Sequence, residues 1–143
     1  MKPRCICLSF VLLLLITFFS GCSAKQASNA EIKNSADAIT EEILVGMNED
    51  NYEKFSANFD QKMKDTLTAE KFKNINAEIK AKIGEYISKE YFNTETKDSY
   101  SIIIYKAKFS KETDDVIVRT VLSESNGKIY VSGFWLDSLT LRQ

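Results

Sequence analysis

The amino-acid sequence predicts an α+β domain in which N-terminal helices pack on one face of a curved, four-stranded antiparallel sheet. Apolar residues recur at intervals of three and four as far as Ile83, which is the period of a helix, and alternate from Glu85 onward, which is the period of a strand. Asn126-Gly127 lies between the last two alternating segments and is a strong signal for a tight hairpin. Because an apolar sheet face needs a cover, we expect the helices on that face.

The composition of the chain limits the fold classes and the functions with which it is compatible. It has 143 residues, of which 44% are hydrophobic and 27% are charged, as expected of one globular domain. Its 19 Lys and Arg residues are balanced by 20 Asp and Glu residues, so we expect no nucleic-acid partner. The sequence contains no histidine, the commonest general base and metal ligand. We therefore expect no metal, no other cofactor and a role that is not enzymatic.

The first residues of the chain have the pattern of an export signal. Lys2 and Arg4 precede an apolar run over residues 6–19. This run is shorter than the roughly 20 apolar residues that a helix needs to cross a bilayer, and it has the length typical of a secretory signal. An ordinary cleaved signal and an uncleaved membrane anchor are both compatible with this run.

The segment that follows narrows the prediction further. Phe19-Ser20-Gly21-Cys22 resembles the lipobox of prokaryotic lipoproteins, although Phe19 stands where that pattern has Leu, Val or Ile. The resemblance implies that residues 1–21 are a signal peptide and that Cys22 is lipidated. The expected partner is then membrane lipid, held through the Cys22 acyl chains on the extracytoplasmic face. Residues 22–30 are expected to be the lipidated cysteine and its tether, and residues 31–143 the domain.

Three helical segments are predicted in the first half of this domain. The first has Ile32, Ala36, Ile39, Ile43 and Met47 on one side and ends at residues 48–51. Tyr52, Phe55, Phe59, Met63 and Leu67 continue the period and predict one or two short helices. The last segment begins at Thr68, a typical N-cap, and ends at Gly84, a typical C-cap.

Four strands are predicted over residues 86–92, 100–109, 116–124 and 128–136, with a loop over residues 93–98. The Asn126-Gly127 turn pairs Ser125 with Lys128, and this register extends along the hairpin. It sets Leu122 opposite Val131, Thr120 opposite Gly133 and Val118 opposite Trp135, all on the apolar face. The preceding hairpin gives the same face if Phe109 lies opposite Val116. The outer face then carries Lys106 and Arg119 beside Ile102, Ile104, Tyr130 and Phe134, which leaves homodimerisation open.

This order of elements resembles the cone-like fold of nuclear-transport-factor-two-like and cystatin-like domains. The chain also contains the local sequences Asn51-Tyr52-Glu53-Lys54-Phe55, Asn58-Phe59-Asp60, Met63-Lys64, Gly84, Asn126-Gly127-Lys128-Ile129 and Gly133. In these residues it resembles an uncharacterised family of prokaryotic exported domains, of the domain-of-unknown-function 3887 type, over about residues 32–136. The resemblance implies the cone and frequent lipid anchoring, and it supplies no catalytic residues.

A cone of this kind encloses a space between its helices and its sheet. We expect that space to be lined by Phe55, Phe59, Tyr105, Thr120, Gly133 and Trp135. Two small residues beside large rings could leave a pocket for a small apolar ligand, whereas a filled core is the alternative, because a domain of this size needs its core for stability. The predicted function is thus a binding or interaction module for an apolar molecule or a membrane-protein partner.

Two other functions are also compatible with the sequence. An isomerase or hydratase on this fold would need a buried carboxylate, for which Glu90 is the candidate, with Tyr105 to stabilise an oxyanion. The first strand can place Glu90 either inside the cone or in solvent, depending on its register. The second of these functions is that of an accessory subunit of a membrane complex that docks through its first helix.

Overall fold

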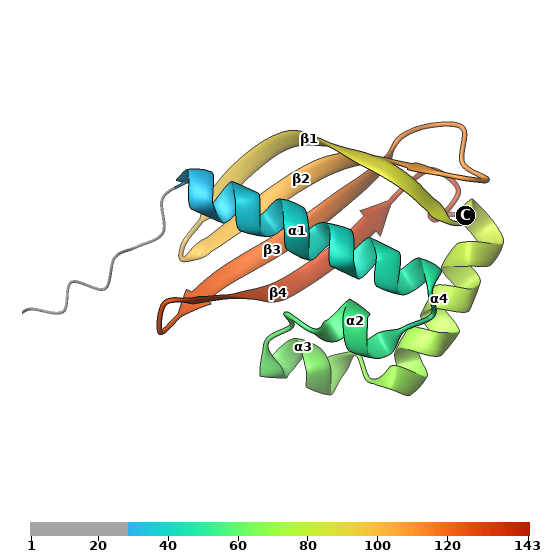
Figure 1. The fold of residues 1–143 in the computed structure, drawn as a ribbon. Coiled ribbons are helices and arrows are strands. Elements are labelled where there is room, and N and C mark those ends of the chain that lie inside the picture. The colour runs from blue at the N-terminus through green and yellow to red at the C-terminus, as the bar shows by residue number, and fades with distance from the viewer. Residues whose placement is uncertain (1–28) are drawn as a thin grey trace, which may run out of the picture.

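The computed structural model describes residues 29–143, which form an α+β domain with one layer of helices and one curved antiparallel sheet (Figure 1). The predicted fold class is therefore confirmed. The helices are α1 (Asn29–Asn48), α2 (Tyr52–Ser56), α3 (Gln61–Thr66) and α4 (Ala69–Ile83). The strands are β1 (Tyr86–Lys97), β2 (Tyr100–Phe109), β3 (Val116–Ser125) and β4 (Lys128–Asp137), in the spatial order β1-β2-β3-β4.

Helix α1 lies across the sheet and contributes its predicted apolar side to the core. Ala36, Ile43 and Leu44 are almost fully buried, and Ile39 and Met47 lie beside them. Figure 1 shows α1 running diagonally over one face of the sheet, with α2 and α4 near its C-terminal end. The opposite side of α1 is exposed and carries small or polar residues, namely Glu31, Asn34, Ala38 and Glu42.

Side-chain caps begin each of the three shorter helices. The Asn51 side chain accepts a hydrogen bond from the Lys54 amide at 3.0 Å, and the Asp60 side chain accepts one from the Met63 amide at 2.7 Å. Thr68 caps α4 in the same way, as predicted, and Gly84 ends it. Each cap satisfies an amide that the first helical turn leaves without a partner, so these residues fix where the helices begin.

Strand β1 is longer than predicted, because the expected loop over residues 93–98 is wrong. The chain stays paired with β2 as far as Lys97 opposite Tyr100, and the turn is made at Asp98, where φ is +55°. Residues 91–97 are exposed on both sides of this projecting edge strand. No apolar alternation could therefore mark the segment as a strand, and only its pairing with Ile102–Ile104 of β2 does so.

The register between β2 and β3 differs from the prediction by two residues. Val116 lies opposite Ala107, whereas the predicted partner, Phe109, lies opposite Tyr86 of β1. Because side chains alternate between faces, a shift of two residues changes every partner and leaves every residue on its predicted face. Tyr105 and Val118 are therefore buried together, with neither side chain measurably exposed.

The register between β3 and β4 is correct near the turn and wrong beyond it. Leu122 lies opposite Val131 as predicted, but an irregularity at Ser132 inserts one extra residue into β4. Thr120 consequently lies opposite Phe134 rather than Gly133. A shift of one residue reverses the faces, so Phe134 points into the domain and Trp135 points outward, where it is 55% exposed.

The core lies between the helices and the inward face of the sheet. At one end it contains an aromatic cluster centred on Phe55, whose ring lies 4.4 Å from that of Phe72, 5.0 Å from that of Phe59 and 6.3 Å from that of Phe134. Within residues 29–143, the buried hydrophobic residues that pack together lie between Ala36 and Val131. The helices and the sheet of this part of the chain thus share one core.

Candidate functional site

The main candidate site is a cavity of about 300 Å³ between α4 and β4, which we call the α4–β4 cavity. Its volume is at the lower end of the range typical of small-molecule sites. Ile75 is 47% exposed, so part of its wall faces solvent. The cavity is lined by Met47, Phe55, Leu67, Phe72, Ile75, Asn76, Ile79, Phe134, Trp135, Leu136 and Leu141.

Most of this lining comes from α4, β4 and the segment after β4. Phe72, Ile75 and Ile79 share one side of α4 because they are spaced by three and four residues. Phe134 and Leu136 come from the inward face of β4, and Leu141 comes from the segment after it. The Phe55 ring packs against both Phe72 and Phe134 and thereby joins the α4 wall to the β4 wall.

Asn76 is the polar residue of the lining, and it is only 1% exposed. Its side-chain amide nitrogen donates to the Met47 carbonyl at 2.8 Å and to the Asp50 carboxylate at 2.7 Å. Both partners can only accept, which fixes the orientation of the amide. Its oxygen Oδ1 has no hydrogen-bond partner within residues 29–143. The lining thus includes a buried acceptor and no titratable side chain.

The carboxylate that holds Asn76 is itself held from α4. Lys80 donates to Asp50 at 2.8 Å and to the Asn48 carbonyl at 2.9 Å. The Lys80 hydrogen bond, supported by that from Asn76, outweighs partial burial and lowers the pKa of Asp50 below its usual value. These contacts join the end of α1 to α4 behind the cavity.

The structure separates the six residues predicted to line one pocket. Phe55 and Trp135 line the α4–β4 cavity. Phe59, Tyr105 and Thr120 are at most 2% exposed and belong to the packed interior.

Gly133 lies on the outer side of β4, where a Cβ atom would collide with the Trp135 ring. The extra residue at Ser132 is the reason that Gly133 and Trp135 lie on the outer side of β4.

The apolar side of α4 could be predicted only in part. The helical period of the sequence grouped Phe72, Ile75 and Ile79 on one apolar side, but no sequence signal placed that side against β4.

A polar cluster lies between α1 and the first two strands. The Tyr86 hydroxyl donates to Glu41 at 2.7 Å, and Lys89 forms an ion pair with the same carboxylate at 3.3 Å. The Lys89 ammonium also lies 5.0 Å from the centre of the Tyr105 ring. Between α1 and β3, the Thr40 and Thr120 hydroxyls are hydrogen-bonded at 2.8 Å in the interior. These contacts attach α1 to the sheet.

A second ion pair continues this cluster toward the start of α1. Lys33 binds Asp37 at 3.0 Å and lies 4.6 Å from the centre of the Tyr91 ring. Burial alone would raise the pKa of Asp37, but the hydrogen bonds and charges around it, chiefly those of Lys33, hold the pKa below its usual value. The Tyr105 hydroxyl is buried and makes no direct hydrogen bond within residues 29–143. Burial, together with the nearby Asp37 carboxylate, raises the pKa of Tyr105 well above its usual value.

The raised pKa of Tyr105 predicts an alkaline loss of stability. An unfolded tyrosine loses its proton near pH 10, whereas folded Tyr105 keeps it. The stabilisation is complete below about pH 10 and decreases above it by at most about 1.4 kcal/mol per pH unit. Urea unfolding between about pH 9 and 11 should therefore give a shallower decrease for Tyr105→Phe than for the wild type. Equal slopes would contradict this assignment.

Glu90 lies on the outer side of β1, opposite Lys106, and is exposed. An irregularity at Ile87 changes the alternation, so Tyr86, Lys89 and Tyr91 point toward α1 while Glu90 points away. Glu90 and Tyr105 are therefore on opposite faces of the sheet. The geometry gives the enzymatic alternative neither a buried Glu90 nor a Glu90–Tyr105 pair.

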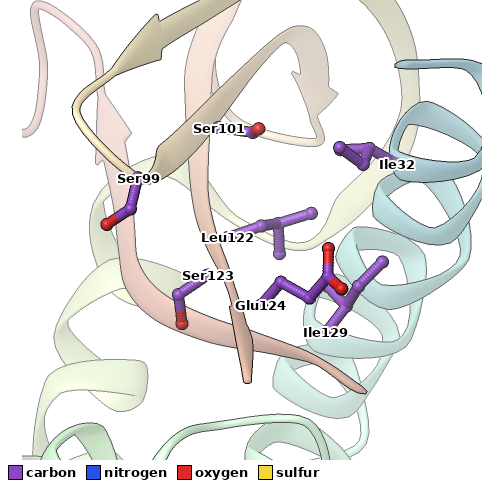
Figure 2. Close-up of a pocket in the computed structure, with 7 residues that line it drawn as sticks. All are labelled: Ile32, Ser99, Ser101, Leu122, Ser123, Glu124 and Ile129. Atoms are coloured by element: carbon purple, nitrogen blue, oxygen red, sulfur yellow. The ribbon is translucent and has the colours of Figure 1, made fainter. Parts of the chain in front are cut away.

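A much smaller cavity, of about 70 Å³, lies under the first turns of α1. Figure 2 shows Ile32 of α1 facing Leu122, Glu124 and Ile129 of the β3–β4 hairpin, with Ser101 nearby. This space can hold a few water molecules at most. It lies at the opposite end of α1 from Met47, which lines the larger cavity.

Within residues 29–143, no group of three or more His, Cys, Asp or Glu side chains is placed to hold a metal ion. In the same part of the chain, no helix has the length and hydropathy needed to span a membrane.

The fold and the cavity together define an α+β domain with one apolar cavity between its last helix and its last strand. The chain belongs to a family described as "Protein of unknown function (DUF3887)", whose sequence model matches residues 40–130. The match spans α1 from Thr40 to β4 at Tyr130 and thus includes the α4 wall of the cavity. No curated protein matches the chain.

Proposed function

We propose that this protein is a membrane-tethered extracytoplasmic binding domain that takes an apolar molecule in the α4–β4 cavity. The observation that carries the proposal is the lining itself, in which ten of the eleven residues are apolar and the remaining one is Asn76. Apolar surface that stays open to a cavity in the free protein favours a ligand that covers it. A lining without titratable groups supports binding rather than acid–base catalysis.

The cone-like fold of nuclear-transport-factor-two-like domains is part of the same proposal. Helices on the concave face of a curved antiparallel sheet, as in Figure 1, are consistent with it. In such an arrangement the open end of the cone gives access to the interior, and the α4–β4 cavity would be that opening. The alternative of an accessory subunit that docks through α1 has less support, because the exposed side of α1 carries no large apolar residue.

Binding of a neutral fluorescent probe tests the cavity. The leaderless chain, residues 23–143, should bind N-phenyl-1-naphthylamine with enhanced fluorescence. Ile75→Glu places a carboxylate in the exposed part of the lining, where desolvating it is costly, so we expect at least about a tenfold loss of probe affinity.

Ile87→Glu is the matched control, because Ile87 is also exposed, at 64%, and lies outside the lining. It should leave the affinity unchanged. An unresponsive wild type, or an equal effect of the two substitutions, would remove the proposed function.

The tether is supported by the lipobox-like residues Phe19-Ser20-Gly21-Cys22, which lie outside the described residues. In cells fed an alkyne-tagged palmitate analogue, the wild-type chain should incorporate the label and Cys22→Ala should not. The label is read by in-gel fluorescence after reaction with a dye azide. Equal labelling of both chains would exclude Cys22 as the site of acylation.

A further inference from the structure

The α4–β4 cavity is lined in part by β4, the strand at one edge of the sheet. Phe134, Trp135 and Leu136 are consecutive residues of β4 and all belong to its lining. Side chains alternate along a strand, so Phe134 and Leu136 point inward while Trp135 points outward. Among the strands of the described residues, β4 pairs only with β3, so its other edge has no neighbouring strand.

The main-chain groups of β4 at this edge can be assigned from the pairing with β3. In an antiparallel pair of strands, opposite residues alternate between hydrogen-bonded pairs and non-hydrogen-bonded pairs, and we call the latter wide pairs. Residues in wide pairs direct their N–H and C=O groups away from the partner strand. The Val131 amide donates to the Asn58 carbonyl at 2.8 Å, away from β3, so Leu122 and Val131 are a wide pair.

Thr120 and Val118 alternate with Leu122 along β3 and therefore also form wide pairs with β4. Their partners are Phe134 and Leu136. The N–H and C=O groups of Phe134 and Leu136 consequently point to the free edge. Outside the helices and the strand pairing, no main-chain hydrogen bond to these groups is present within residues 29–143.

The same edge already pairs with an extended segment elsewhere. Asn58 and Asp60 bond to both main-chain groups of Val131, which forms a parallel bridge between Phe59 and Val131. The Phe59 side chain is thereby inserted into the core and is 2% exposed. The chain then turns away into α3, which leaves the next part of the edge, at Phe134 and Leu136, unpaired.

We propose that the ligand of the α4–β4 cavity is an extended peptide segment that adds to the edge of β4 beside Phe134 and Leu136. This inference rests on the proposed binding function and names the class of ligand. The outward N–H and C=O groups of β4 carry partial charges that an extended main chain complements with an acceptor and a donor at the same spacing. The added strand would continue the pairing that Asn58–Asp60 begins at Val131.

The cavity determines which peptide fits. Alternate side chains of an extended peptide point to the same side, so every second residue would face α4. Those side chains would meet Phe72, Ile75 and Ile79 and should be apolar, of the size of valine or leucine. The residues between them would face solvent and can be polar. The ligand class is therefore an extended segment in which apolar and polar residues alternate.

The test uses a fluorescein-labelled, end-capped heptapeptide in which leucine alternates with threonine. Fluorescence anisotropy with the leaderless chain, residues 23–143, should show saturable binding that Ile75→Glu abolishes. Two further peptides carry N-methyl groups on the leucine amides or on the threonine amides. Only one of these two sets can face β4, so their affinities should differ by at least about tenfold. Equal affinities of the two methylated peptides would overturn the proposal.

A pair of protein variants tests the same edge from the other side. Leu136→Pro removes an N–H that points away from β3, whereas Leu136→Ala keeps that N–H and also shortens the side chain. We expect Leu136→Pro to bind the heptapeptide at least about tenfold more weakly than Leu136→Ala. Thermal unfolding of both variants establishes that they are folded. If Leu136→Pro is unfolded, the methylated peptides decide the question alone.

The outcomes separate the two proposals. Binding of the neutral probe without binding of the heptapeptide would leave the proposed function in place and overturn the peptide inference. Failure of both ligands would overturn both proposals.

Discussion

Replacing Phe55 with alanine is expected to lower the free energy of unfolding by about 3–5 kcal/mol. Phe55 is 4% exposed, and its ring contacts those of Phe59, Phe72 and Phe134. The loss therefore combines the transfer of a large apolar side chain with a hole where α2, α4 and β4 meet. Because small domains are stable by only about 5–15 kcal/mol, this single change should bring the protein close to its unfolding threshold.

Urea unfolding followed by circular dichroism measures this effect. The denaturation midpoint should fall while the slope of the transition stays constant. Phe92→Ala is the matched control, since Phe92 is 56% exposed and contacts the Lys106 ammonium at 4.6 Å, a contact worth about 1 kcal/mol or less. Similar losses for both variants would show that the cluster around Phe55 is not the centre of stability.

Gly84→Ala is expected to cost about 3–5 kcal/mol, through backbone strain and a steric clash together. Gly84 joins α4 to β1 with φ of +80° and ψ of −154°, a conformation that residues with a Cβ atom rarely adopt. A Cβ atom there would also lie 2.9 Å from the Lys111 amide nitrogen. That amide donates to the Ile83 carbonyl at 3.0 Å, so moving it would break the contact between α4 and the β2–β3 turn.

Gly127→Ala is the control without a steric clash. Gly127 has a similar φ of +73° in the β3–β4 turn, but no atom beyond its chain neighbours lies within 4 Å of the added Cβ. Its loss should therefore be only the conformational contribution of about 1–2 kcal/mol. The difference between the two unfolding free energies measures the clash at Gly84 together with the additional strain of its ψ of −154°. Equal losses would mean that Gly84→Ala relaxes both without cost.

Local sequence signals were sufficient for most of the fold. Thr68 and Gly84 delimit α4, and Asn126-Gly127 sets the β3–β4 turn, because each acts through its own backbone or its nearest neighbours. The faces of β2 and β3 were also predicted correctly. The core residues of both strands alternate, although Ile104 on the outer face of β2 is also buried, and the two-residue error opposite Val116 did not disturb that alternation.

The candidate site could be predicted only in part, because it depends on one inserted residue. Nothing in the local sequence marks Ser132 as an extra residue in β4, since its hydroxyl bonds to Ser123 on the outer face as that of an ordinary outward residue would. Because of that insertion, Phe134 lies on the inward face of the sheet and Trp135 on the outward face, the reverse of the prediction. The position of α4 beside β4 likewise depends on tertiary packing around Phe55, which no period in the sequence reports.

The two edge strands of the sheet, β1 and β4, differ in how readily a further strand can pair with them. Along β1, irregularities at Ile87 and Phe92 interrupt the regular pairing geometry, and charged residues such as Glu90, Glu95 and Lys97 would meet any incoming chain. The edge of β4 has an apolar wall beside it instead. At high protein concentration, self-association by strand pairing should therefore begin at β4, and a ligand bound at that edge would prevent it.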